Sequence, residues 1–366
     1  MRSTLILIWL LSSTTLSAQL KTLPSGDNKR ASVSEQVGLT DINIIYSRPG
    51  VKGREGQIWG TLVYTGYADQ GFGNNRKAPW RAGANESTSI SFSNDVTIEG
   101  KPLPAGKYGL FMAYDPNETT LIFSKNSTSW GSYYYDESED ALRVTVKPVP
   151  QEKSTEWLKY EFVNQTDSSA TIQMVWEKLS IPFKVETDVV KNQLASFRNE
   201  LRTDKGFNWV PWFQAAQWCA NRGVNLEQAL QWADSASSMT FGGNTQFIAH
   251  ATKAQILDLL GRDSEAATVM KNAMRYATMQ DIHQYGRQLI QQKKNKEALE
   301  VFKQNAAKNP KQFTTLVGLA RGYSANGDYK TALKYAQQAQ PLAPDQLNKT
   351  NVENIIKMLK EGRDIN

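Results

Sequence analysis

The residue types best suited to chemistry in this chain are arginines, tryptophans and tyrosines that recur with polar neighbours between positions 48 and 136. Guanidinium groups clamp carboxylates and phosphates through paired hydrogen bonds, and aromatic faces pack against a sugar ring or another apolar face. We therefore predict a binding cluster for a glycan or a small anionic ligand. Its members are Arg48, Arg54, Trp80, Arg81, Asn85, Glu86, Trp130, Tyr133 and Tyr135.

The same residues also allow a purely structural interpretation. Arg81 would then pair with Glu86 across a turn, while Trp80 and Trp130 would fill the core of a β-rich domain. Buried aromatic side chains and arginine–carboxylate pairs are common in proteins that hold no ligand. The sequence leaves both interpretations open.

Catalytic and metal chemistry have few residues available, because the chain holds two His and one Cys. We interpret His250 and His283 as helix residues in surface or packing roles. Glu86 with Asp136 is the one carboxylate pair that we nominate for glycoside hydrolysis. The acidic run 136–140 lacks the spacing of a calcium-binding loop, so we interpret it as a solvated turn. We predict no catalytic residue, no metal site and no cofactor.

Residues 1–18 are typical of a secretory signal peptide, since one arginine precedes a short apolar core that ends in small polar residues. Cleavage is expected near Ser17 or Ala18, and residues 19–28 are expected to form a linker. The apolar core is shorter than the roughly 20 apolar residues that a membrane-spanning helix needs. We therefore expect an exported protein, periplasmic or extracellular, with no membrane span.

Residues 29–187 have the pattern of an all-β, sandwich-like domain. Ile42, Ile44 and Tyr46 alternate with more polar residues, as in a strand with one buried face. Glycine- and proline-containing turns separate further short runs, which favours a sandwich over alternating strands and helices. These further strand predictions include 60–64, 170–176 and 181–186.

The pattern changes after a predicted linker or helix at 188–204, and residues 205–366 repeat with a helical period. An offset of 34 residues aligns Leu299 with Leu333, and 34 is the tetratricopeptide (TPR) period. Residues 350–362 predict a terminal capping helix, which closes the open apolar end of a repeat array. We therefore predict an all-α domain of TPR-type repeats.

Two further features of this half bear on its packing and its partners. Ala320, Ala332 and Ala339 are small enough to let paired helices approach closely. Residues 189–366 hold 23 Lys/Arg and 15 Asp/Glu, a net charge of +8, whereas residues 19–188 carry a net charge of −3. An acidic protein partner or an anionic polymer suits this charge, and export argues against a nucleic acid.

The β-rich half resembles the DUF2911 family over about residues 29–186. The resemblance is carried by four ordered segments, which read RASVSEQVGLTDINIIYSRPGVKGRE, APWRAGANESTSISFSNDVTIEGKPLPAGKYGLFM, SWGSYYYDESEDALRVTVKP and TIQMVWEKLSIPF. The loop between Tyr64 and Trp80 is longer than the usual family pattern. The resemblance implies an exported bacterial protein of the Bacteroidetes type, with a β-rich domain, a C-terminal TPR array and no established activity.

Two functional hypotheses follow. The leading one is an envelope protein that acts as a binding or scaffold module, with a protein or peptide partner held by the helical repeats. The alternative is a carbohydrate-binding or small-ligand-binding β domain, with hydrolysis as an option, that uses Arg48, Arg81, Glu86 and Trp130.

Overall fold

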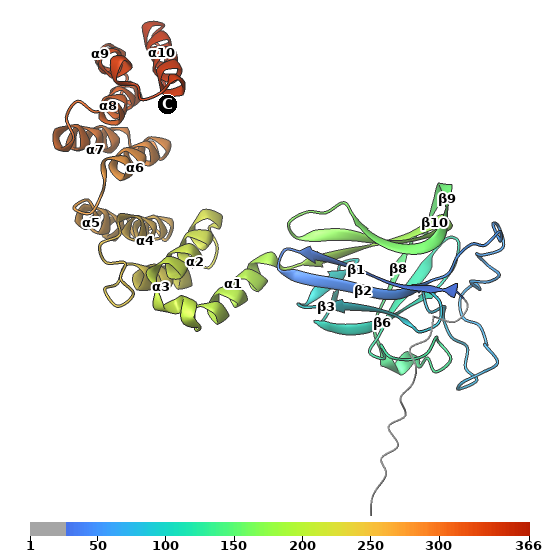
Figure 1. The fold of residues 1–366 in the computed structure, drawn as a ribbon. Helices are drawn as coiled ribbons and strands as arrows, with labels where there is room; N and C mark the ends of the chain where they lie inside the picture. The colour runs from blue at the N-terminus through green and yellow to red at the C-terminus, as the bar shows by residue number, and fades with distance from the viewer. Residues whose placement is uncertain (1–26) are drawn as a thin grey trace, which may run out of the picture. The chain divides into compact units, whose positions relative to one another are not determined.

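The computed structural model describes residues 27–366 (Figure 1). The predicted signal peptide and most of the predicted linker lie outside these residues. The described chain divides into two compact units, the first ending at Ala195 and the second running from Ser196 to Asn366. No helix within the described range is long and apolar enough to cross a membrane.

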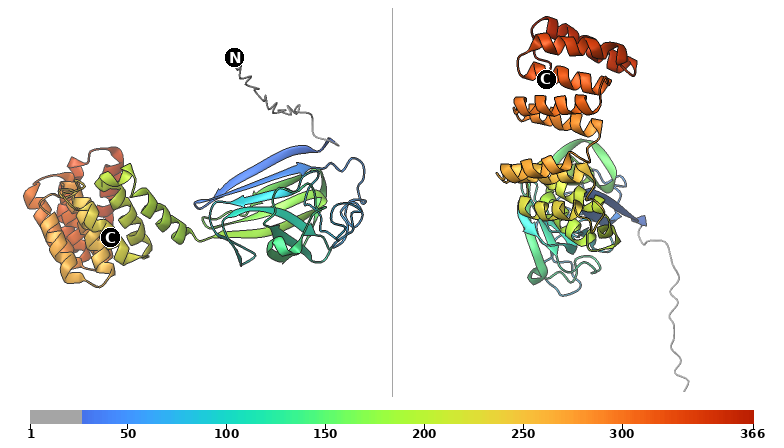
Figure 2. Two further views of the ribbon diagram at one scale, coloured as in Figure 1. Left: turned by 90° about the horizontal axis from the view of Figure 1, so that it is seen from below. Right: turned by 90° about the vertical axis from the view of Figure 1, so that its left-hand side faces the viewer.

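The first unit consists of two antiparallel sheets, which confirms the predicted all-β, sandwich-like fold class (Figures 1 and 2). The larger sheet has the strand order β1-β2-β3-β6-β7-β8, and the smaller has the order β5-β4-β10-β9. The strands of the larger sheet are β1 (Lys29–Val37), β2 (Thr40–Arg48), β3 (Thr88–Phe92), β6 (Gly106–Ala113), β7 (Thr119–Ser124) and β8 (Asp140–Val146). Those of the smaller sheet are β4 (Val96–Ile98), β5 (Lys101–Leu103), β9 (Val149–Val163) and β10 (Ser169–Thr187).

The core of this unit lies between the two sheets. On β2, Ile42 and Ile44 are fully buried and Tyr46 is buried, as their alternation predicts. Phe123 of the larger sheet meets Phe183 of the smaller one edge to face, with ring centroids 6.0 Å apart. Burial of each such side chain contributes about 1.5–3 kcal/mol to folding.

The predicted strand at 60–64 is wrong, because this segment is a turn. Gly60 has a φ of 86°, and the N–H of Val63 donates to the carbonyl oxygen of Ile58 at 2.8 Å. Leu62 is 48% exposed, and no neighbouring strand continues a hydrogen-bonded ladder along the segment. A short apolar run does not specify a ladder partner, so its strand-like composition misled the prediction.

The runs predicted as two strands, 170–176 and 181–186, belong to the single strand β10. Between them, Glu177 has a φ of 51° and the pairing with β9 shifts register. The buried Glu177 carboxylate accepts a hydrogen bond from the N–H of Gly56 at 2.6 Å. This bulge bends the strand without ending it and ties it to the loop after β2.

The second part of the chain is a series of helical hairpins followed by one terminal helix (Figures 1 and 2). Helices α6, α8 and α10 begin 34 and 33 residues apart, which agrees with the predicted TPR-type period. The helices are α1 (Val189–Glu200), α2 (Trp209–Arg222), α3 (Leu226–Ala236), α4 (Phe247–Leu259), α5 (Asp263–Ala273), α6 (Met279–Gln291), α7 (Asn295–Lys308), α8 (Phe313–Ala325), α9 (Tyr329–Ala339) and α10 (Gln346–Lys360).

Small residues allow these helices to pack closely. The alanines at 320, 332 and 339 are fully buried, as predicted. Phe302 of α7 is also fully buried and fills space left by glycines on two other helices. A methyl group added at Gly286 of α6 would lie 2.5 Å from Cε1 of Phe302, and one at Gly318 of α8 would lie 2.7 Å from its Cδ1.

Candidate functional site

A cavity of 610 Å³ in the first unit gathers four of the nine predicted binding residues, namely Arg54, Trp80, Arg81 and Asn85. The loop after β2, the turn at 60–64 and the turn before β3 supply its walls, and Trp176 of β10 also lines it. Every charged side chain in this lining is a cation, namely Lys52, Arg54 and Arg81. The lining therefore suits a ligand with negative charge.

The turn that carries Arg81 is fixed by hydrogen bonds. Nε1 of Trp80 donates to the carbonyl oxygen of Gly83 at 3.1 Å. The carbonyl oxygen of Ala82 accepts from Oγ1 of Thr88 at 3.0 Å and from the hydroxyl of Tyr160 at 2.8 Å. Ala82 has a φ of 52°, a left-handed conformation that costs an alanine about 1–2 kcal/mol. The surrounding hydrogen bonds offset this cost and keep the turn in its conformation.

Backbone carbonyl groups, not carboxylates, position the two arginines of the cavity. Nε of Arg54 donates to the carbonyl oxygen of Val51 at 3.0 Å, and its Nη2 donates to that of Gly50 at 2.8 Å. Nη1 of Arg81 donates to the carbonyl oxygen of Asn85 at 2.9 Å. Within residues 27–366 neither guanidinium forms an ion pair, and each retains N–H donors that these hydrogen bonds do not use.

The alternative pairing of Arg81 with Glu86 is wrong. Glu86 pairs with Arg30 at 3.5 Å and accepts a hydrogen bond from Oγ of Ser47 at 3.2 Å. The guanidinium of Arg81 lies instead over the ring of Tyr133, 5.1 Å from its centroid. Glu86 therefore does not contribute to the 610 Å³ cavity.

Three tryptophans meet beside the cavity. Trp80 and Trp176 stack with ring centroids 6.2 Å apart, and Trp59 lies edge-on to them at 5.8 Å and 6.1 Å. Trp80 thus belongs to the core, as the structural interpretation holds, and also lines the cavity. Trp176 is 1% exposed, and its Nε1 has no hydrogen-bond partner in the part of the chain that the structure describes.

Besides Glu86, four members of the predicted cluster do not line this cavity, namely Arg48, Trp130, Tyr133 and Tyr135. Nε of Arg48 donates to the carbonyl oxygen of Leu158 at 2.7 Å and links the two sheets. Trp130 is 53% exposed, so the interpretation that it fills the core is wrong. Tyr135 is buried and packs edge-on against Phe111 at 5.4 Å. The predicted cluster is therefore divided among several places in the unit.

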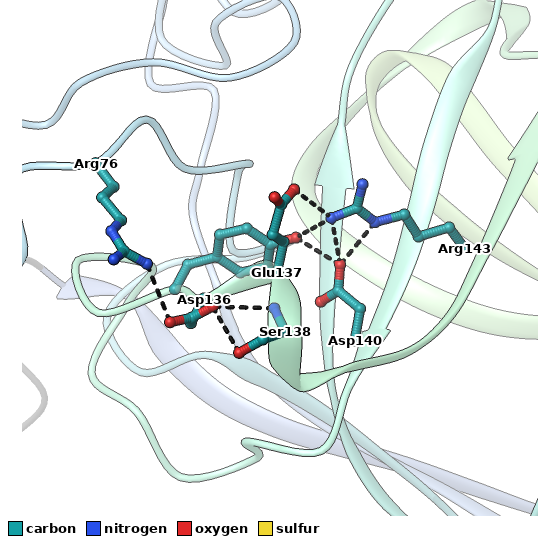
Figure 3. Close-up of polar contacts among 7 residues, drawn as sticks. Arg76, Asp136, Glu137, Ser138, Asp140 and Arg143 are labelled. Atoms are coloured by element: carbon teal, nitrogen blue, oxygen red, sulfur yellow. Dashed lines mark hydrogen bonds and ion pairs between the residues drawn. The ribbon is translucent and has the colours of Figure 1, made fainter.

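The acidic run is held by cations and a hydroxyl (Figure 3). Asp136 pairs with Arg76 at 3.1 Å and accepts from Oγ of Ser138 at 2.8 Å, while Asp140 pairs with Arg143 at 2.6 Å. The Asp140 side chain is 7% exposed, and burial raises the pKa of its carboxyl group. The interpretation as a solvated turn is therefore wrong at Asp140. Among the described residues no group of three or more His, Cys, Asp or Glu is placed to hold a metal ion.

A second cavity, of 590 Å³, lies in the helical unit and is lined by α6, α8 and α10. Two of these are the first helices of successive hairpins, so the same side of each repeat faces the cavity. His283 and Arg287 lie one turn apart on α6, and Val317 and Arg321 lie one turn apart on α8. We call this cavity the α6/α8/α10 groove, defined by Gln280, Asp281, His283, Gln284, Arg287, Phe313, Thr314, Val317, Arg321, Pro344, Asn348, Asn351, Val352 and Ile355.

His283 is neutral at pH 7 in this groove. Burial lowers its pKa to about 4, and the charges of Arg321 and Arg287 act in the same direction. Its Nδ1 is buried with no hydrogen-bond partner in the described chain. Its ring also packs against Phe302, with centroids 5.6 Å apart, which agrees with the predicted packing role.

The two arginines of the groove have different surroundings. Burial and the charge of Arg287 lower the pKa of Arg321, the charge of Asp364 acts in the opposite direction, and Arg321 donates to the carbonyl oxygen of Ile365 at 3.1 Å. Arg287 has neither a hydrogen bond nor an ion pair with any described residue. The carboxylate of Asp281, also in the lining, accepts from the N–H and Oγ1 of Thr278 at 2.9 Å and 2.7 Å as a helix cap.

Sequence reasoning nominated neither groove arginine, and it missed Trp176 and Tyr64 in the lining of the first cavity. The spacing of Arg287 four residues after His283, and of Arg321 four after Val317, was a usable signal for the groove once the helices were placed. Nothing in the sequence connects Trp176 with Trp80, because 96 residues separate them.

Comparisons with known proteins match each unit separately. Residues 28–185 match the family described as "Protein of unknown function (DUF2911)". The comparison with curated protein sequences found no match.

Several solved structures are similar to part of this chain. YrrB, described as a TPR protein with an unusual peptide-binding site, is 16% identical to this chain. The match covers 46% of this chain and 84% of YrrB, with a TM-score of 0.29. A chain of the APC/C complex Cut9–Hcn1 is 20% identical, with 46% and 34% of the two chains covered and a TM-score of 0.30. MamA from Desulfovibrio magneticus RS-1 is 19% identical, with 42% and 90% covered and a TM-score of 0.28.

The family match spans the strands of both sheets and the turns that carry Arg54 and Arg81. It ends before α1, so the helical hairpins lie outside it. The unit of two sheets therefore carries the match to the DUF2911 family, and we call it the DUF2911 domain; TPR-like helical repeats follow it in the same chain.

Proposed function

We propose that this protein is a non-catalytic binding module whose helical repeats hold an extended, acidic segment of a partner protein in the α6/α8/α10 groove. The observation that carries the proposal is Arg287, a groove cation without a hydrogen bond or ion pair to any described residue. Arg321 places a second guanidinium in the same lining. Carboxylates of a bound segment would pair with both groups through charge-assisted hydrogen bonds.

The remaining lining of the groove suits a peptide more than a small ion. Phe313, Val317 and Ile355 are partly buried and offer apolar contacts to side chains. Asn351 and Gln284 are exposed amides that donate and accept hydrogen bonds, as the backbone of an extended peptide requires. Together these contacts would bind an acidic segment that also carries apolar residues.

The charge of the helical half supports the same class of partner. Residues 189–366 carry a net charge of +8, while the full chain carries +6. A positive field of this size attracts acidic partners and speeds their association at low ionic strength. A basic partner would meet repulsion in the groove and from the rest of this half.

We also propose that the chain is exported to the periplasm or beyond the cell, so that the partner is an envelope or extracellular protein. This part of the proposal rests on the signal-peptide pattern of residues 1–18 and on the bacterial family resemblance. Detection of the mature N-terminus near position 18 by mass spectrometry of the secreted or periplasmic fraction would support it, and an intact N-terminus on cytoplasmic protein would contradict it.

The binding proposal is tested by fluorescence anisotropy with the full chain and a short rhodamine-labelled peptide. The peptide is rich in Asp, Glu and Val, and its control carries Asn and Gln at the acidic positions. We expect the acidic peptide to bind more tightly. The double substitution Arg287→Gln with Arg321→Gln should weaken its binding by at least about tenfold.

The matched control removes two positive charges from the same unit but outside the groove, through Lys330→Gln and Lys334→Gln. Both lysines are exposed on α9, which does not line the groove. We expect this control to change the affinity less than about threefold, through long-range charge alone. Equal effects of the two double variants, or equal binding of the two peptides, would refute the groove as the binding site.

A further inference from the structure

We infer that the DUF2911 domain carries a separate binding site, in which the cavity between the loop after β2 and the turn before β3 binds a small organic anion. The ligand class is a carboxylate or phosphate joined to a ring or another apolar body. The inference rests on residues of the first unit and is independent of the groove in the helical repeats.

The cavity is lined by positive charge that no carboxylate in its lining compensates. Arg54 and Arg81 line the cavity and are partly buried, yet neither has an ion pair in the described chain, and no Asp or Glu lines the cavity. Lys52 adds a third cation, which pairs with Asp27 at 3.6 Å. Partly buried guanidinium groups that face one cavity without counter-ions are stabilised by an anion that enters it.

The two guanidinium groups of the cavity are already held in place before a ligand binds. Carbonyl oxygens already hold the guanidiniums of Arg54 and Arg81, so little side-chain freedom remains to be lost when a ligand binds. The turn beside Arg81 keeps Ala82 at a φ of 52°. Strained backbone of this kind persists where the surrounding structure enforces it, and it concentrates at binding sites.

One side of the cavity is apolar. Trp80, Trp176 and Val63 are buried and Leu62 is exposed in the same lining, so the cavity combines its cations with an apolar wall. A simple inorganic anion would leave the apolar wall unused.

Size and charge together select the ligand class. A volume of 610 Å³ lies within the range of roughly 300–1,000 Å³ typical of small-molecule sites. A neutral sugar would stack on aromatic groups but would leave Arg54 and Arg81 without counter-ions. The observations therefore favour an organic anion over a neutral glycan.

The test is isothermal titration of the full chain with benzoate, phenyl phosphate, benzamide and glucose. Benzamide has the shape of benzoate without its charge, and the two anions distinguish a carboxylate site from a phosphate site. We expect at least one anion to bind at least about tenfold more tightly than benzamide. Glucose should bind no more tightly than benzamide.

Three variants locate the binding. Arg81→Gln should weaken the binding of the preferred anion at least about tenfold, and Arg54→Gln provides a second charge variant if Arg81→Gln unfolds. Ala84→Phe should block both anions and benzamide, because Ala84 lines the cavity. Lys147→Gln is the matched control: Lys147 is exposed, lies outside the lining and should leave binding unchanged.

The inference is overturned if neither anion binds, if benzamide binds as tightly as the anions, or if folded Arg81→Gln and Arg54→Gln both bind like the unsubstituted chain. Binding of glucose without binding of either anion would also overturn it, in favour of a neutral-glycan site. Circular dichroism of each variant establishes that it is folded. None of these outcomes bears on the peptide experiment, whose variants lie in the helical repeats.

Discussion

His283 shows how one side chain can serve both packing and binding. Its ring fills space between α6, α7 and α8, and its buried Nδ1 lies among the groove residues without a partner in the described chain. The arginines beside it disfavour its charged form, as does its burial. The groove therefore combines two guanidinium groups with one histidine that is neutral at pH 7.

The lowered pKa of His283 predicts a pH dependence of stability. The folded state holds the pKa near 4, below the ordinary value of 6.5, so the unfolded state takes up a proton first as the pH falls. The stability linked to neutral His283 is therefore complete above pH 6.5 and is lost as the pH falls toward 4. His283→Leu removes this contribution.

Thermal melting of the full chain and of His283→Leu across this pH range measures the effect. We expect the melting temperature of the unsubstituted chain, relative to the variant, to fall as the pH decreases from 6.5 to 4. Carboxylates common to both proteins cancel in the difference. A difference that does not vary with pH would show that His283 titrates normally.

At the scale of elements, a bulky side chain on one helix packs against glycines on the neighbouring helices. Phe302 on α7 occupies the space next to Gly286 on α6 and Gly318 on α8. An alanine at either glycine would collide with its ring, whereas glycine in a helix normally costs about 1 kcal/mol relative to alanine. The close approach to Phe302 explains why these helices keep the less favourable residue.

This arrangement predicts that two substitutions do not add. Phe302→Ala should destabilise the helical unit by about 3–5 kcal/mol, and Gly286→Ala alone by about 1–3 kcal/mol. In the Phe302→Ala background, Gly286→Ala should become neutral or stabilising, because the clash is gone and helix propensity improves. Urea unfolding followed by circular dichroism measures all four proteins, and additive effects would exclude the proposed contact.

Helices and strands were more predictable from the sequence than binding sites, because the patterns that specify them repeat over short stretches of the chain. The 34-residue offset and the alternation in β2 repeat locally, so the sequence alone indicates the helical hairpins and the sheet core. The turn at 60–64 has the composition of a strand but no ladder partner, and only the fold can show that.

The cavity of the first unit was likewise predictable only where its residues are close together in the sequence. Residues close in sequence, such as Trp80, Arg81 and Asn85, do line one cavity. Arg48 and Trp130 do not, because the direction in which a side chain points depends on the strand or loop that carries it. Trp176 reaches the cavity from a strand far along the chain, a contact that no local pattern contains.

At the scale of the whole molecule, charge divides the chain into two halves with different binding chemistry. The β-rich half carries a net charge of −3 and places two arginines and a lysine in one cavity, whereas the helical half carries +8 and places arginines in a groove. Each compact unit therefore has a candidate site of its own: a small anion for the DUF2911 domain and an acidic protein segment for the repeats.

The most direct measurement of the central claim is hydrogen–deuterium exchange of the full chain with and without the acidic peptide. Bound peptide stabilises the helices that it contacts and slows the exchange of their amides. The account predicts slower exchange in α6, α8 and α10 and unchanged exchange in β1 to β10. Protection confined to the β strands, or to α2 and α3, would contradict it.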